Sequence, residues 1–241
     1  MLAPHSQSLR SLLPEAVATV EARPCHWQSQ LHAVEQDYVD GRRMHARRLA
    51  EFRAGRACAR DALAQIGRHD WPLIPAASRE PQWPEGVVGS ITHSGDYCAA
   101  AVAATYAMAA IGIDAEATDR CAESAAPFIC TDRELAQLDS CRAIGRRILL
   151  TLIFSAKESV FKAIFPRGRV LLDMRDVEIE ILADRGTFRG RCLSTDCADA
   201  VAGIEGRFDV SAARVLTVAT LRARPAQTKY LFNPLGMSCA Y

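Results

Sequence analysis

The chain has 241 residues, enough for one large domain or two small ones. Hydrophobic residues make up 49% and charged residues 24%, as is ordinary for a soluble globular protein, and the formal net charge is +1. This balance gives no electrostatic argument for a nucleic-acid or membrane partner. The sequence shows no signal segment and no apolar run long enough to cross a bilayer, so we expect a cytoplasmic protein.

Patterns along the chain predict a loosely ordered start, residues 1–14, followed by a series of strands and helices. Strands are expected at Ala16–Ala22, Gly86–His93, Tyr97–Ala104, Met108–Glu116, Val177–Leu182, Thr187–Leu193, Gly203–Val210 and Arg214–Leu221. Helices are expected at Gln36–Gln65, Thr131–Cys141 and Arg147–Phe165. The helix after Thr131 opens with a capping box formed with Glu134. The order of a helix followed by strands occurs twice, which predicts an α+β fold of two similar lobes, residues 1–116 and 117–241, with a cleft between them.

Nine cysteines are scattered along the chain, and no two of them form a C-x-x-C pair. The odd number and irregular spacing favour free buried thiols over a disulfide framework or a zinc site.

The first predicted helix is strongly basic. Arg48, Arg56 and Arg60 lie near one face, because steps of eight and four residues return to similar angles on an α-helix. Arginine is the side chain best shaped for bidentate phosphate binding, although a solvated charged face would give the same pattern.

A histidine closes the strand that reads Gly89-Ser-Ile-Thr-His93. Its side chain could donate a hydrogen bond to a phosphate. Taken alone, His93 is more often a packed or surface residue.

Two carboxylates end the strand that precedes residue 117. Asp114 and Glu116 are two residues apart, so their side chains point to one face of the strand. Together with Glu158, they would suit a hard divalent ion such as Mg²⁺, completed by phosphate oxygens and water. A solvated strand end is the competing interpretation.

The helix Arg147–Phe165 is the most informative element. Its polar side chains form one narrow stripe and the rest of its circumference is apolar, as in a helix buried within a fold. The stripe consists of Thr151, Ser155, Glu158, Ser159 and Lys162. Lys157 lies outside this stripe in an apolar arc, so its amine must either reach solvent along a packed stem or meet an anion.

In their order along the chain, these fragments resemble the 4′-phosphopantetheinyl transferases of the Sfp/EntD type, which activate carrier proteins. The resemblance rests on four blocks: Arg48-Leu-Ala-Glu-Phe52 with Arg56-Ala-Cys-Ala-Arg60, Trp83-Pro-Glu-Gly-Val-Val-Gly-Ser-Ile-Thr-His93, Ile111-Gly-Ile-Asp-Ala-Glu116, and Phe154-Ser-Ala-Lys-Glu-Ser-Val-Phe-Lys-Ala163. The last block is the most specific. The family fold is a pseudo-dimer of two α+β lobes with the active site at their interface, in agreement with the repeated order of elements.

The resemblance also implies a role for each candidate site residue. Asp114, Glu116 and Glu158 would hold Mg²⁺. His93 and Lys162 would contact the pyrophosphate of coenzyme A, and Lys157 a phosphate oxygen. Arg48 and Arg56 would contact the 3′-phosphate, Thr92 would lie against the nucleotide, and Arg79 is the nearest candidate for a basic residue that precedes Trp83 in relatives.

The implied reaction is Mg²⁺-dependent transfer of 4′-phosphopantetheine from coenzyme A to a serine of an apo-acyl, peptidyl or aryl carrier protein, releasing adenosine 3′,5′-bisphosphate. Glu158, alone or through a metal-bound water, would be the base, with Lys162 and His93 assisting. Siderophore, non-ribosomal peptide and polyketide synthases are the expected clients, and we expect a monomer. A non-catalytic module that binds coenzyme A or carrier protein, and a metal-dependent phosphohydrolase, are the alternatives.

Overall fold

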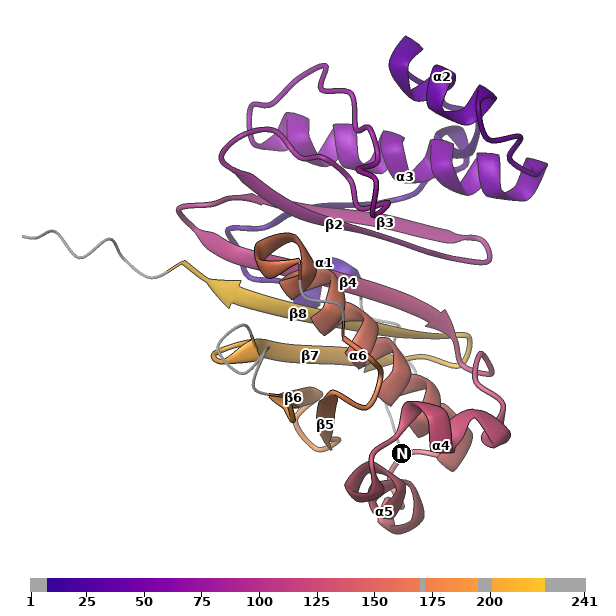
Figure 1. The fold of residues 1–241 in the computed structure, drawn as a ribbon, viewed down its shortest axis with the longest axis vertical. Helices are drawn as coiled ribbons and strands as arrows, with labels where there is room; N and C mark the ends of the chain where they lie inside the picture. Colours follow the sequence, from indigo (N-terminus) through magenta and orange to yellow (C-terminus); the bar gives the residue numbers. More distant parts are fainter. Residues whose placement is uncertain (1–7, 170–171, 195–200, 224–241) are drawn as a thin grey trace, which may run out of the picture.

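The computed structural model describes residues 8–169, 172–194 and 201–223. Its strands form two antiparallel sheets (Figure 1). The first sheet has the order β1-β3-β2 and the second the order β4-β8-β7-β6-β5. The strands are β1 (Ala18–Glu21), β2 (Val87–Ser94), β3 (Tyr97–Ala104), β4 (Met108–Ala117), β5 (Val177–Leu182), β6 (Thr187–Cys192), β7 (Glu205–Val210) and β8 (Arg214–Arg222).

Each sheet has one long helix packed against it, so the molecule has two α+β lobes, as the sequence predicts. The helices are α1 (Leu9–Leu12), α2 (Ala33–Asp40), α3 (Ala46–Gln65), α4 (Ala126–Ile129), α5 (Asp132–Ser140) and α6 (Arg146–Gly168), with short 3-10 turns at Pro24–Gln28 and Glu123–Ala125. Helix α3 covers the first sheet and α6 crosses the second. None of the helices in the described ranges is long and apolar enough to cross a membrane.

The sheets divide the chain between β3 and β4, earlier than the boundary after residue 116 that we expect from the sequence. Strand β4 pairs with β8 along its length, for example Asp114 with Thr217, although β4 follows directly from the β2–β3 hairpin. The candidate carboxylates Asp114 and Glu116 therefore belong to the second sheet, at its β4 edge. The candidate His93 belongs to the first sheet.

The predicted basic helix is two helices in the structure. Gly41 caps α2, and Arg43 adopts a left-handed conformation with φ 44°, which ends one helix before His45 caps the next. The two helices remain in contact, because the Tyr38 and Phe52 rings stack with centroids 5.8 Å apart.

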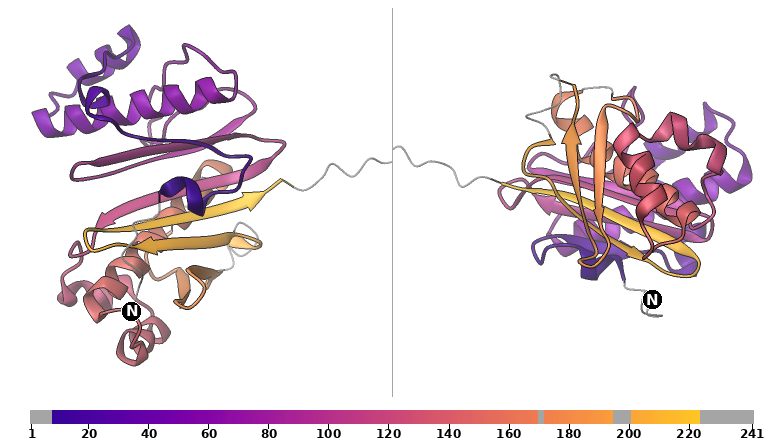
Figure 2. Two further views of the ribbon diagram at one scale, coloured as in Figure 1. Left: turned by 180° about the vertical axis from the view of Figure 1, so that it is seen from behind. Right: turned by 90° about the horizontal axis from the view of Figure 1, so that it is seen from below.

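Residues 8–14 are more ordered than the sequence suggests, whereas residues 1–7 of the same predicted segment lie outside the described residues. Helix α1 buries Leu9 and Leu12 completely or nearly so. They join a hydrophobic cluster that also takes in β3, β4 and β8, and the left view of Figure 2, seen from behind, shows α1 in front of β8. This cluster packs the first lobe against the second.

Most of the cysteines in the described ranges behave as expected. Cys58, Cys98, Cys121 and Cys130 are buried free thiols, and Cys25 and Cys141 are free as well. Cys192 departs from the prediction, since it is disulfide-bonded.

Helix α6 lies in direct backbone contact with β4. A Cβ atom at Gly112 would stand 1.8 Å from the Ser159 carbonyl oxygen, so only glycine permits this approach. The polar stripe of α6 consequently lies against the strand end that holds Asp114, as the sequence pattern requires.

Candidate active site

Asp114 is the centre of the site and is almost completely buried. Its Oδ1 atom accepts a hydrogen bond from the Lys162 amine at 2.7 Å, and its Oδ2 atom accepts one from the Ser155 hydroxyl at 2.8 Å. The Ser155 hydroxyl also lies 2.9 Å from that of Thr217, which donates to the Ser155 carbonyl. These contacts fix the rotamer of Asp114 from both α6 and β8. The sequence places Ser155 in the polar stripe and in the last motif block without indicating this contact, and it gives no signal for Thr217.

Two other carboxylates, Glu116 and Glu158, lie close enough to Asp114 for its charge to act on them. Burial, followed by the charge of Asp114, raises the pKa of Glu116 to about 7. Burial also raises the pKa of Glu158, with Asp114 adding to the shift and Lys162 opposing it. The charge of Asp114 thus acts on both Glu116 and Glu158, although within the described ranges no three acidic, histidine or cysteine side chains are grouped closely enough to hold a metal ion by themselves.

His93 ends β2 on the other side of the seam between the lobes. Its Nε2 atom lies 2.5 Å from Arg48 Nη1, and its Nδ1 atom lies 3.5 Å from Glu51 Oε2. Because a guanidinium only donates, Nε2 must be an acceptor, and the imidazole is neutral in this arrangement. Burial and the Arg48 charge lower the pKa of His93.

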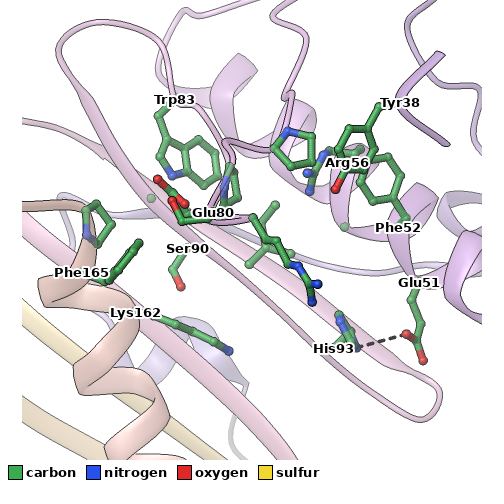
Figure 3. A pocket seen from close by; sticks show the side chains of 18 of the residues that line it. Tyr38, Glu51, Phe52, Arg56, Glu80, Trp83, Ser90, His93, Lys162 and Phe165 are labelled. Carbon is green, nitrogen blue, oxygen red and sulfur yellow. Dashed lines mark ion pairs between the residues drawn. The ribbon is translucent and has the colours of Figure 1, made fainter. Parts of the chain in front are cut away.

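A cavity of about 500 Å³ opens between the lobes, and the predicted basic side chains lie around it (Figure 3). Its lining includes Arg48, Arg56, Arg79, His93 and Lys162. The walls between them are apolar, with Phe52, Trp83, Phe161, Phe165 and several prolines. The cavity is suited to an anionic ligand that also has a flat apolar part.

Arg56 is held rigidly in this cavity. Its Nε atom donates to the Leu73 carbonyl at 2.7 Å, and its guanidinium lies 4.2 Å above the Phe52 ring. Burial lowers the pKa of Arg56 to about 10, so the side chain remains cationic at neutral pH. Arg60, by contrast, pairs with the buried Glu35 at 2.9 Å, away from the cavity, and is structural.

Several predicted site residues do not line this cavity. Asp114, Thr92 and Lys157 are buried, and Glu116 and Glu158 border two other pockets. Thr92 is buried in the seam instead of facing the cavity: its hydroxyl accepts the Ala115 N–H at 2.9 Å and donates to Asp114 at 3.4 Å. Lys157 lies within the second lobe, where its amine donates to Glu134 and to the carbonyls of Ile129 and Met174, each at 2.7 Å.

The structure thus differs from our sequence interpretation of Lys157, which placed its amine on a phosphate oxygen. All three donors of the ammonium group are satisfied by protein acceptors, and the side chain is only 3% exposed. Its partner Glu134 is fully buried and also accepts the Ile179 N–H at 2.6 Å. Lys157 and Glu134 therefore form a structural ion pair that joins α6 to α5.

Two family models match the chain. Residues 34–103 match a 4′-phosphopantetheinyl transferase N-terminal domain, and residues 110–218 match the 4′-phosphopantetheinyl transferase superfamily. The transferase Svp of Streptomyces mobaraensis is 37% identical over 76% of this chain and 75% of its own length. The chain belongs to the 4′-phosphopantetheinyl transferase family.

Other proteins similar to this chain include a second 4′-phosphopantetheinyl transferase and a component of enterobactin synthase. The 4′-phosphopantetheinyl transferase PptT of Mycobacterium tuberculosis is 33% identical over 73% of this chain and 80% of its own length. Enterobactin synthase component D of Salmonella typhi is 37% identical over half of each chain. Among solved structures, the Thermotoga maritima holo-[acyl-carrier-protein] synthase matches 48% of this chain and 65% of its own, with 22% identity and a TM-score of 0.38.

Proposed function

We propose that this transferase moves 4′-phosphopantetheine from coenzyme A to a serine hydroxyl of an apo-carrier protein and releases adenosine 3′,5′-bisphosphate. The observation that supports the proposal is the cationic cavity between the lobes, whose lining residue Lys162 donates a hydrogen bond to the buried Asp114 at 2.7 Å. Carrier domains of siderophore, peptide or polyketide synthases are the proposed acceptors, and a cytoplasmic monomer is the proposed form of the enzyme.

The nucleotide half of coenzyme A would occupy the cavity of about 500 Å³. Arg48, Arg56 and Arg79 would neutralise the 3′-phosphate, and His93 and Lys162 the pyrophosphate. Arg56 is the best prepared of these, because its hydrogen bond to Leu73 and its contact with Phe52 hold it in place before a ligand arrives.

The acidic trio fits a hard divalent cation such as Mg²⁺. Asp114, Glu116 and Glu158 would supply oxygen ligands. Burial, with the charge of Asp114 adding to it, raises the pKa of Glu116 and of Glu158, and a cation beside them would favour their charged forms. Since no three acidic, histidine or cysteine side chains in the described part of the chain are grouped closely enough to hold a metal ion by themselves, binding would need pyrophosphate oxygens and water as further ligands. When bound, the ion would neutralise charge that develops on the pyrophosphate.

The transfer step needs alignment and a base, and no protein nucleophile. The serine oxygen forms a bond to the β-phosphorus of coenzyme A while the bond from that phosphorus to the bridging oxygen breaks. Glu158 is the proposed acceptor of the serine proton, and its raised pKa brings it closer to the pH at which a carboxylate is an effective base. Lys162, which lines the cavity, would stabilise the leaving phosphate.

Mass spectrometry tests this function directly. Purified protein is incubated with coenzyme A, Mg²⁺ and several apo-carrier proteins, and both products are quantified. A carrier heavier by one phosphopantetheine, with an equal amount of adenosine 3′,5′-bisphosphate, supports the proposal. Coenzyme A that binds without turnover would indicate a binding module, and release of phosphate without carrier modification a phosphohydrolase.

A further inference from the structure

The carboxylate of Glu80 lines the cavity and lacks hydrogen-bond donors. Both of its oxygens are buried, and no group in the described ranges donates a hydrogen bond to either one. Arg169 forms an ion pair with Glu80, with its Nη1 atom 2.7 Å from Oε1, and the same nitrogen donates its hydrogen bond to the Ser78 hydroxyl. Arg169 therefore balances the charge at Oε1, whereas Oε2 has neither a hydrogen bond nor an ion pair within the described ranges. A buried carboxylate normally accepts several hydrogen bonds, so Oε2 is available to a donor from a ligand.

The surroundings of Glu80 are shaped for a flat ring. Trp83 lies directly against β2, because a Cβ at Gly89 would stand 2.8 Å from two of its ring atoms. Phe165 of α6 faces the same part of the cavity, and Figure 3 shows Glu80 beside Trp83, on the side away from His93. An aromatic ring could therefore rest on these walls while its phosphates reach the cations at the other end.

We propose that Glu80 determines nucleobase specificity by accepting a hydrogen bond from an exocyclic amine of the bound nucleotide. This inference rests on the proposed function, in which the nucleotide is that of coenzyme A and its base is adenine. Adenine offers two N–H donors on its exocyclic nitrogen, whereas hypoxanthine has a carbonyl oxygen at that position. An oxygen placed against the Glu80 carboxylate would be repelled, because neither atom carries a proton to share.

A purely structural role for Glu80 makes a different prediction. Arg169 ends α6 in a left-handed conformation, with φ 53°, and its contacts with Ser78 and Glu80 join the second lobe to the loop of the first. If Glu80 only anchors this contact, removal of Arg169 should change nucleotide binding as much as removal of the Glu80 charge.

Calorimetric titration with adenosine 3′,5′-bisphosphate and inosine 3′,5′-bisphosphate separates the two roles. We expect the unmodified protein to bind the adenosine compound about tenfold or more tightly, as for other polar sites that reject a mismatched analogue. In Glu80→Gln the preference should fall at least about fivefold, mainly through better binding of the inosine compound, because the amide can donate to its carbonyl. Arg169→Met and the exposed control Glu85→Gln should keep the preference.

Three results would overturn the inference. They are equal binding of both compounds by the unmodified protein, an unchanged preference in Glu80→Gln, and an equal loss of preference in Arg169→Met. The comparison of the two ligands in the unmodified protein decides the matter even if Glu80→Gln does not fold. If the protein modifies a carrier but shows no preference between the two nucleotides, only the inference about Glu80 is wrong. If it binds neither compound and modifies no carrier, the proposed function is wrong as well.

Discussion

The hydroxyl of Thr92, on β2, accepts the backbone N–H of Ala115, on β4, at 2.9 Å. One step along the seam, the Ser90 hydroxyl accepts the Ile113 N–H at 3.1 Å. Side-chain oxygens thus satisfy backbone donors of β4 at the point where the two sheets meet. Since Asp114 lies between these two donors, the seam also fixes the position of the central carboxylate.

The substitution Thr92→Val should therefore reduce both stability and activity. It keeps the side-chain shape but leaves the Ala115 N–H buried without a partner, at a cost of about 1–3 kcal/mol in the free energy of unfolding. Urea denaturation measures this loss, and Thr92→Ser, which retains the hydroxyl, is the matched control. Equal stability of the valine and serine variants would show that the seam hydrogen bond contributes nothing.

Lys157→Met should destabilise the fold strongly. The change leaves Glu134 buried without its cation, and breaking a buried pair in this way typically costs about 3–5 kcal/mol. In the double variant Lys157→Met, Glu134→Gln, part of the lost stability should be recovered, because no unpaired charge then remains. Denaturation of the single and double variants checks this, and a fully stable Lys157→Met protein would contradict the structural role.

Binding of adenosine 3′,5′-bisphosphate should take up protons near pH 6.5. Burial and Arg48 keep the pKa of free His93 below its usual value, so the imidazole is neutral there; a phosphate beside it favours the charged form and raises the pKa. Affinity should therefore increase as the pH falls through this range. Calorimetry in buffers of different ionisation enthalpy measures the uptake, which His93→Gln should remove; an unchanged uptake in that variant would assign the proton to another group.

Arg48 and Arg56 should make the enzyme prefer coenzyme A to its 3′-dephospho form. A charge-assisted contact is worth about 1.5–3 kcal/mol, which corresponds to a preference of about tenfold or more in kcat/KM. The preference should shrink in Arg56→Ala and persist in Arg68→Ala, an exposed arginine outside the cavity lining. If both nucleotides give equal kcat/KM values with the unmodified protein, these arginines do not bind the 3′-phosphate.

The features that the sequence predicts correctly are those that depend on the spacing of residues close together in the chain. Period-two and period-3.6 patterns place the strands and α6 close to their observed bounds, and the capping box of Thr131 and Glu134 is confirmed. The basic cavity could also be anticipated, since Arg48 and Arg56 occupy one helix face and both line it.

What the sequence does not predict depends on partners distant along the chain. The acceptors of Lys157 come from three separate segments, so its helical arc alone could not distinguish a ligand contact from a buried ion pair. Likewise, Thr217 meets Ser155 only because β8 pairs with β4. The resemblance of the four sequence blocks to the transferase family predicts the order of the motifs along the chain, but it does not predict these tertiary contacts.

The most direct test of the account is carrier modification by the unmodified protein and by variants of the acidic trio. With coenzyme A and Mg²⁺, the unmodified protein should convert an apo-carrier to the phosphopantetheinylated form, and excess chelator should abolish the reaction. Asp114→Ala and Glu158→Gln should remain folded, keep nucleotide binding and lose at least about tenfold in kcat/KM, as expected for one charged contact in the transition state. Full carrier modification in excess chelator, or by Asp114→Ala, would contradict the account.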